Sequence, residues 1–95
     1  MSVKEMKRMA RAFVFLKVDL TRVQKVMDDL LKYPEVKEVH ETTGEKDIFV
    51  VLEVQRDILV PSAQKIADFV SEKIGRIHGI KDTETIIPTK SKIKS

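Results

Sequence analysis

The chain has 95 residues, 42% hydrophobic and 35% charged, which is typical of one small globular domain, and its lack of cysteine excludes disulfides and zinc–thiolate sites. The basic residues gather at the ends: residues 1–11 and residues 89–95 each carry +3, so residues 12–88 of a chain with net charge +3 must carry −3. An acidic body argues against direct sequence-specific DNA binding, and no stretch is apolar and long enough for a membrane span or a signal peptide. We therefore expect a cytoplasmic protein with a basic N-terminal segment (1–11), one folded domain (12–88) and a basic flexible tail (89–95).

The first predicted element is a buried strand over residues 12–18, where apolar, aromatic and β-branched side chains follow one another without a break. A helix is expected from Thr21, because Gln24 three residues later completes a capping box. Pro34 ends this helix, since the residue before a proline avoids helical geometry. Its apolar stripe consists of Val23, Val26, Met27, Leu30 and Leu31.

The middle of the chain predicts a β-hairpin. Residues 36–43 form a weaker and more polar strand, which suits the edge of a sheet. Residues 44–47 contain glycine and form a tight turn. Residues 48–54 form a second strongly apolar strand.

The last third predicts a second helix and a final strand. Pro61 and Ser62 open the helix, and the chain breaks at Gly79. A strand over residues 80–87 follows and is stopped by Pro88. The apolar face of the second helix is expected to be Ala63, Ile66, Ala67, Val70, Ile74 and Ile77.

The order of elements is therefore β-α-β-β-α-β. This order predicts the α+β class and a ferredoxin-like βαββαβ sandwich, with a four-stranded antiparallel sheet and two helices on one face, as in dimeric αβ-barrels. Right-handed crossovers are expected to place the first and third strands side by side and parallel, with the second and fourth strands at the edges.

The sheet face away from the helices predicts a homodimer. Side chains alternate between the two faces of a strand, and we assign the aliphatic set of residues 12–18 and 48–54 to the helix side. The other face would then be exposed in a monomer, and contiguous apolar patches usually mark an interface; the alternative is that the termini cover it. Because symmetric dimers are common, we predict a sheet-to-sheet homodimer. The interface residues are Phe13, Phe15, Phe49 and Val51.

Catalytic and metal chemistry find little support in the chain. His40 lies on the polar edge strand and His78 in a helix-ending turn, 38 residues apart, which is no metal-ligand spacing. No nucleophile elbow, phosphate loop or pair of catalytic carboxylates is present. We predict no catalytic residue, no metal and no cofactor, and therefore no enzyme.

Two polar features remain as candidates for binding. The first is the hairpin Thr42–Asp47, whose backbone N–H groups can hold a carboxylate while Asp47 takes an ammonium group. Simple hairpin chemistry explains the same residues. The second is the pair Thr83 and Thr85, whose hydroxyls share one face of the last strand, although threonine is also common in edge strands for its shape alone.

Together these features resemble a known family. Residues 36–47 are similar to the V-x-x-V-x-x-x-x-G-x-x-D segment of the Lrp/AsnC regulators, and residues 77–85 are similar to that family's I-x-G-V-x-x-T-x-T ending. The resemblance implies an effector-binding (RAM) domain over residues 12–88, with sheet-paired dimers that assemble into octameric or other rings and bind amino-acid effectors between dimers. The ligand-binding residues that it implies are Thr43, Gly44, Glu45, Asp47, Thr83 and Thr85.

Two departures from the family shape the functional prediction. Full-length members carry an N-terminal helix-turn-helix domain, whereas only 11 residues precede the first strand here. Lys46 stands where the family often has an aromatic residue. The prediction is a regulatory domain that modulates transcription by sensing an amino acid and by assembling, without a DNA-binding domain of its own. The alternatives are an assembly module that joins a full-length Lrp/AsnC regulator without sensing a ligand, and a small αβ-barrel enzyme that uses His40.

Overall fold

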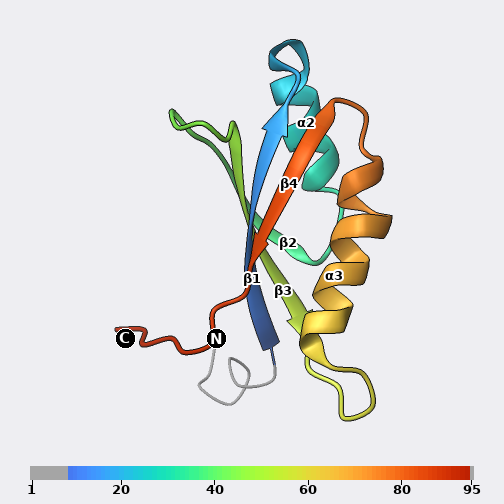
Figure 1. Ribbon diagram of the computed structural model, residues 1–95, viewed down its shortest axis with the longest axis vertical. Helices are drawn as coiled ribbons and strands as arrows, with labels where there is room; N and C mark the ends of the chain where they lie inside the picture. The colour runs from blue at the N-terminus through green and yellow to red at the C-terminus, as the bar shows by residue number, and fades with distance from the viewer. Residues whose placement is uncertain (1–8, 95) are drawn as a thin grey trace.

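The computed structural model describes residues 9–94 and shows a four-stranded sheet with its helices on one face (Figure 1). This is the expected α+β, ferredoxin-like arrangement. The elements in chain order are β1 (Met9–Val18), the 3-10 turn η1 (Leu20–Arg22), α2 (Val23–Leu30), β2 (Val36–Glu41), β3 (Ile48–Gln55), α3 (Ser62–Glu72), the 3-10 turn η2 (Ile74–Arg76) and β4 (Ile80–Ile86).

The strand order is β2-β3-β1-β4, so the first and third strands are central and the second and fourth are edges, as expected. The expectation that β1 and β3 run parallel is wrong, because every neighbouring pair is antiparallel. The reason is topological. The helix crossover makes β2 run in the same direction as β1, and the hairpin then reverses β3 against both.

The helix-facing side of the sheet forms the core. Val14 and Leu16 of β1 pair with Val50 and Ile48 of β3, and all four side chains are fully buried. Strand β1 begins at Met9, three residues before the expected start, because Met9 still pairs with Gln55 at the far end of β3. The aliphatic residues that alternation assigned to the helix side of the sheet are thus the buried ones, as predicted.

The first helix begins differently from the prediction. The carboxylate of Asp19 accepts hydrogen bonds from the backbone N–H of Thr21 at 3.0 Å and from its hydroxyl at 2.7 Å. The hydroxyl of Thr21 is therefore taken, and Arg22 precedes α2 without a side-chain cap. The prediction of a capping box at Thr21 and Gln24 is wrong, because the Asp19 carboxylate competes for the unpaired N–H groups at the start of the helix. Leu31, expected in the apolar stripe, lies exposed after the helix.

The second helix is rotated relative to the predicted face. Ile66, Val70 and Ile74 are buried as expected, but Ala63 and Ala67 are exposed. Phe69 is buried instead and meets Tyr33 edge-on, with ring centroids 5.6 Å apart. A phenylalanine removes far more apolar area from water than two alanines, so it sets the rotation of the helix.

Both edge strands carry charged side chains on their exposed positions. Lys37, Glu38 and Glu41 are exposed on β2, and Lys81 and Glu84 are exposed on β4. Strand β2 ends at Glu41, two residues before the expected end.

The turn into β4 depends on Gly79. Its φ is +103°, a left-handed conformation that other residues rarely adopt, and an added Cβ would lie 3.1 Å from the side chain of Arg22. The Gly79 carbonyl accepts a hydrogen bond from the Asp19 backbone N–H at 2.7 Å. The break predicted at Gly79 is confirmed. The hydrogen bond between Asp19 and Gly79 ties the end of β1 to the start of β4.

Candidate functional site

The β2–β3 hairpin folds back onto the end of β1 through Asp47. The Asp47 backbone N–H donates to the Leu16 carbonyl at 2.8 Å, and its carbonyl accepts from the Thr42 N–H at 2.9 Å. Its carboxylate accepts a third hydrogen bond, from the backbone N–H of Val18 at 2.9 Å. Asp47 therefore braces the hairpin against β1 and has one carboxylate oxygen committed to the backbone.

The strand ladder slips at the same place. Lys17 pairs with Asp82, but the next residue, Val18, pairs with Ile80, so the register between β1 and β4 shifts there. The carboxylate of Asp47 binds the Val18 amide at this irregularity. Bulges of this kind re-aim side chains at the ends of sheets, and here the shift lies beside Asp47 of the hairpin.

An ion pair joins the hairpin to β4 across the end of β1. The ammonium of Lys46 lies 3.0 Å from a carboxylate oxygen of Asp82. The hydrogen bond from Lys46 lowers the pKa of the Asp82 carboxyl, and the same bond to Asp82 raises the pKa of the Lys46 ammonium. The sequence analysis singled out Lys46 but not Asp82. A single aspartate on an edge strand carries no sequence signal for an ion-pair partner 36 residues away.

The predicted ligand-binding residues divide between two places. Thr43, Gly44 and Glu45 are exposed at the tip of the hairpin, and Gly44 does not use a positive φ. Thr83 and Thr85 pair in register with Leu16 and Val14, so their side chains lie on the helix side of β4.

The end of β1 lies between the two groups. Leu16 is the shared neighbour: its carbonyl receives the Asp47 N–H on one side, and it pairs with Thr83 on the other. Asp82 lies one residue before Thr83 and, by alternation, on the opposite face of β4. The Lys46–Asp82 pair therefore presents an ammonium and a carboxylate on one face of the sheet, whereas the hydroxyls of Thr83 and Thr85 lie on the other, helix-facing side.

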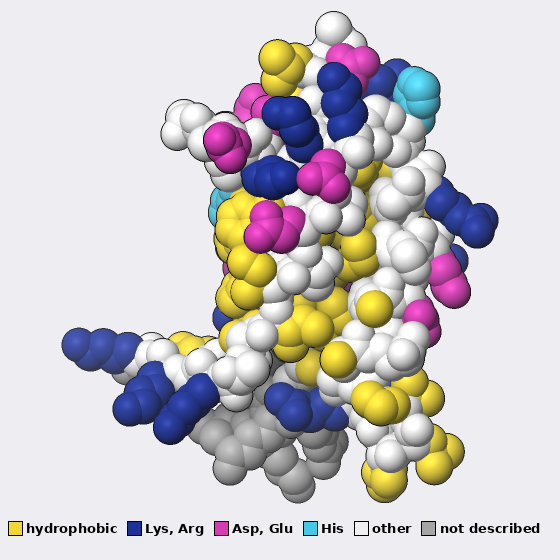
Figure 2. All heavy atoms as spheres, viewed as in Figure 1, with side chains coloured by type: hydrophobic (Ala, Val, Ile, Leu, Met, Phe, Trp, Pro, Cys, Tyr) yellow, Lys and Arg dark blue, Asp and Glu magenta, His cyan; other side chains and the backbone are white. Residues whose placement is uncertain are grey.

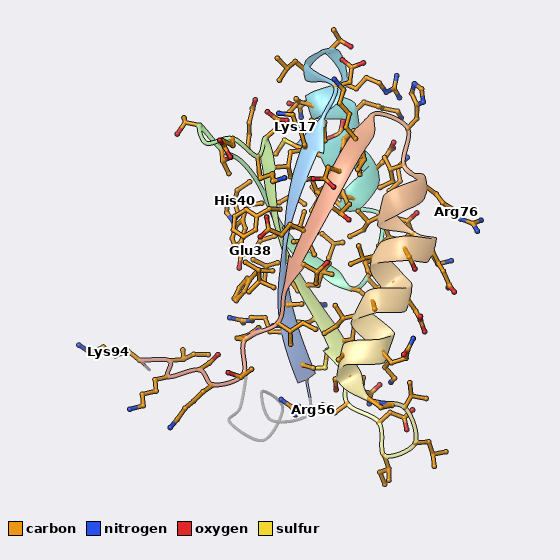
Figure 3. The ribbon with its side chains drawn as sticks, viewed as in Figure 1. Lys17, Glu38, His40, Arg56, Arg76 and Lys94 are labelled. Carbon is orange, nitrogen blue, oxygen red and sulfur yellow. The ribbon has the colours of Figure 1, made fainter. Side chains whose placement is uncertain are left out.

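An aromatic cluster lies on the face of the sheet away from the helices. The Phe49 ring stacks on Phe13 with centroids 5.7 Å apart and contacts Phe15 at 5.0 Å, and all three rings are half-buried. The imidazole of His40 stacks on the same ring at 6.0 Å. Figure 2 shows hydrophobic side chains gathered on this side of the molecule, and Figure 3 shows His40 and Glu38 beside them. Val51 is the exception to the expected exposure, because it is only 5% exposed within the chain.

A charged pair borders the cluster. Arg11 and Glu53 are register partners on β1 and β3, and the Arg11 guanidinium lies 3.1 Å from the Glu53 carboxylate. The Glu53 side chain is only 9% exposed, so the guanidinium compensates a carboxylate held largely out of water. By alternation both residues face the same side as the phenylalanines.

A hollow lies at the opposite end of β3 from the hairpin. It has a volume of about 610 Å³ and is wide open to solvent. Pro34, Val54 and Phe69 give it an apolar lining, and charged residues of α3 and β2 surround these, including Lys37, Asp68, Glu72 and Lys73. None of the predicted ligand-binding residues lines this hollow.

Within residues 9–94 no cluster of three or more His, Asp or Glu side chains is arranged to hold a metal ion. No helix in this range has the length and apolar character needed to cross a bilayer. His40, the weak catalytic candidate, forms a 2.9 Å hydrogen bond with Glu38 and is more than half exposed.

Comparison with known proteins identifies the family of this fold. Residues 11–95 match the family model described as the Lrp/AsnC ligand binding domain. An HTH-type transcriptional regulator of Pyrococcus horikoshii is 36% identical over 81 residues, which are 85% of this chain and 48% of the relative. The chain therefore spans about half the length of the curated relatives that it matches.

Two solved structures share the fold. AsnC of Escherichia coli superposes with a TM-score of 0.83 at 23% identity, over 100% of this chain and 60% of that protein. A transcriptional regulator of Neisseria meningitidis, solved as a complex with L-Met, superposes with a TM-score of 0.71 at 21% identity, over 100% of this chain and 58% of that protein. The family match and the identity to the Pyrococcus regulator show that the chain belongs to the Lrp/AsnC ligand-binding domains of transcriptional regulators.

Proposed function

We propose that this domain binds a free amino acid at the end of β1, where the hairpin meets β4, and that it acts as a cytoplasmic regulator of transcription through sheet-paired assembly. The observation that carries the proposal is the Lys46–Asp82 ion pair beside the braced Asp47. A free amino acid is a zwitterion, with one positive and one negative charge that match this ion pair. Its carboxylate can replace Asp82 as the partner of Lys46, and its ammonium can replace Lys46 as the partner of Asp82.

The surrounding residues fit that ligand class. The exposed backbone at the hairpin tip, residues 43–45, supplies further hydrogen-bonding groups beside Lys46. Thr83 and Thr85 face the helix side of β4, so their predicted role as ligand-binding residues is not part of this proposal. The complex of the Neisseria regulator with L-Met supports an amino acid as the ligand.

The aromatic cluster supports the assembly half of the proposal. Phe13, Phe15 and Phe49 are half-buried in a single chain, although they are stacked into one apolar surface. A second copy of the sheet would remove these rings from water, and the edges of the patch carry the charged pair Arg11–Glu53, which orients the two sheets. Such dimers assembled into rings would place amino-acid sites between them.

Titration calorimetry against the twenty amino acids tests the sensing function. We expect one or a few amino acids to bind at up to millimolar concentration, and Lys46→Met and Asp82→Asn each to weaken that binding at least about tenfold, a loss of 1.4 kcal/mol that one charged hydrogen bond can supply. Asp47→Ala should abolish binding by releasing the hairpin from β1.

Lys32→Met is the matched control. Lys32, in the turn after α2, forms an ion pair of similar length with Asp29, 3.2 Å. Its loss should leave amino-acid affinity unchanged. If no amino acid binds at millimolar concentration, the sensing function is wrong.

A second candidate function rests on the aromatic cluster alone: the domain joins a full-length Lrp/AsnC regulator through its sheet and needs no ligand. Purification of the tagged protein with its cellular partners would then recover a regulator with a helix-turn-helix domain. Phe49→Ser should lose this partner, whereas Lys46→Met should keep it.

A further inference from the structure

A second carboxylate stands beside the Lys46–Asp82 ion pair. Glu84 lies two residues after Asp82 on β4, so both side chains point to the same face of the sheet, about 6.6 Å apart along the strand. Glu84 is exposed, and no ion pair among residues 9–94 involves it. A ligand can therefore reach this carboxylate without displacing another cation from it.

The charges around the ion pair are unequal. The hydrogen bond to Asp82 is the main cause of the raised pKa of the Lys46 ammonium, and the charges of Glu84 and Glu45 raise it further, so both carboxylates lie near the ammonium. Lys17, the register partner of Asp82, is a second cation on this face. A zwitterion bound to Lys46 and Asp82 uses one charge of each sign, which leaves two carboxylates against one lysine. The remaining surface is complementary to a positive charge.

An aromatic ring lies beside Glu84. Phe15 of β1 is the register partner of Glu84, and its half-buried ring is the end of the aromatic cluster nearest Lys17. Figure 2 shows charged side chains of both signs directly above the hydrophobic side chains on this side of the molecule. A ligand side chain that runs from Asp82 toward Glu84 therefore passes an aromatic ring and ends at a carboxylate.

We propose that the domain selects a basic amino acid, lysine or arginine, and that Glu84 binds the cation at the end of its side chain. The inference rests on the proposed amino-acid site at Lys46 and Asp82. The three or four methylene groups of such a side chain suit the step of about 6.6 Å from Asp82 to Glu84 and can pack on Phe15. The cation at its end pairs with the Glu84 carboxylate and lies against the phenylalanine ring.

The same geometry disfavours other amino acids. A neutral side chain takes up the space beside Glu84 without offering its carboxylate a partner. An acidic side chain would place a second negative charge next to Glu84. Glu84 thus selects by attraction of one class and repulsion of another, which is how a charged residue makes a site specific.

Titration calorimetry with four L-amino acids tests this selection: lysine, arginine, glutamate and norleucine, which has the four-carbon stem of lysine without its ammonium. Lysine or arginine should bind at least about tenfold more tightly than norleucine, the effect of one charged hydrogen bond. Glu84→Gln should remove most of this difference and leave the affinity for norleucine unchanged. An unchanged norleucine affinity shows that the rest of the site is intact in the variant.

Two further variants separate a direct contact from a general effect of charge. Glu84→Lys should reverse the preference, so that glutamate binds more tightly than lysine. Glu38→Gln is the matched control, because Glu38 is an exposed carboxylate on the other edge strand, β2. This control should keep the preference of the wild type.

The outcomes distinguish this inference from the proposed function. If neutral or acidic amino acids bind as tightly as lysine and arginine, the amino-acid site stands and the selection of a basic side chain is wrong. A preference for lysine that survives Glu84→Gln overturns the role of Glu84. If none of the twenty amino acids binds at millimolar concentration, both the site and the selection are wrong.

Discussion

The two faces of the sheet are built from the same two central strands but meet different requirements. Toward the helices, Val14, Leu16 and Leu52 are aliphatic and fully buried. On the other face, one residue along each strand, Phe15 and Phe49 are aromatic and only half-buried. The first face is completed by the chain's own helices, whereas the second stacks its rings on one another and still meets solvent.

This difference separates folding from assembly. Residues on the covered face contribute to the free energy of unfolding of a single chain, because their burial is complete without a partner. Residues on the open face have more to gain from a second copy than from the fold. The proposed dimer contact lies on the open face, and the proposed ligand site lies at the hairpin end of the sheet.

The largest expected effect comes from the covered face. Leu52→Ala removes a fully buried side chain from the centre of β3 and should lower the free energy of unfolding by about 2–5 kcal/mol. Urea denaturation at low protein concentration measures this change. A loss below about 1 kcal/mol would contradict the division between the faces, since it would mean that Leu52 is not part of a close-packed core.

An intermediate effect is expected from the open face. Phe49→Ser removes the ring that stacks on Phe13 and Phe15, and each half of a dimer would lose it. The dimer dissociation constant should rise at least about tenfold, because burying a phenylalanine contributes about 1.5–3 kcal/mol. Sedimentation equilibrium measures the constant. Leu31→Ser, on the exposed outer surface after α2, should leave it unchanged; an equal effect of both variants would argue against a sheet-to-sheet dimer.

The smallest expected effect is the pH dependence of the Lys46–Asp82 ion pair. The ion pair lowers the pKa of Asp82 below its ordinary 3.8 and raises that of Lys46 above its ordinary 10.5. Its contribution is thus fully present between these values, is lost as the pH falls through the lowered Asp82 pKa, and is lost again as the pH rises through the raised Lys46 pKa. NMR titration of the Asp82 carboxyl should give a midpoint below 3.8, and Lys46→Met should move it upward. An unmoved midpoint would show that Lys46 is not its partner.

The sequence predicted most of the fold because hydrophobic periodicity records which side of an element is buried. The alternation in β1 and β3 separated the aliphatic from the aromatic face, and the hairpin and the break at Gly79 were located correctly. The direction of β3 relative to β1 was wrong, although the hairpin before it already requires β3 to run against β2. The mistake lay in the topological reasoning, not in the pattern.

Two kinds of feature could not be predicted from the sequence: competition between neighbouring residues, and ion pairs between residues far apart in the chain. Asp19 displaced the predicted capping box because two polar side chains compete for the same N–H groups, and their order of preference depends on backbone geometry. Phe69 displaced Ala63 and Ala67 because the helix rotates to bury its largest apolar side chain. Asp82 was missed because its partner Lys46 is brought to it only by the register of three strands.

The charged edges have a consequence for how this molecule associates. An unpaired strand edge is a template for strand addition, the step by which β proteins grow into fibrils, and charged side chains on the edge oppose that step. Both β2 and β4 carry such charges along their exposed positions. Growth in the plane of the sheet is thereby disfavoured at both edges, so the chain can keep an apolar face available for a partner without polymerising through its backbone.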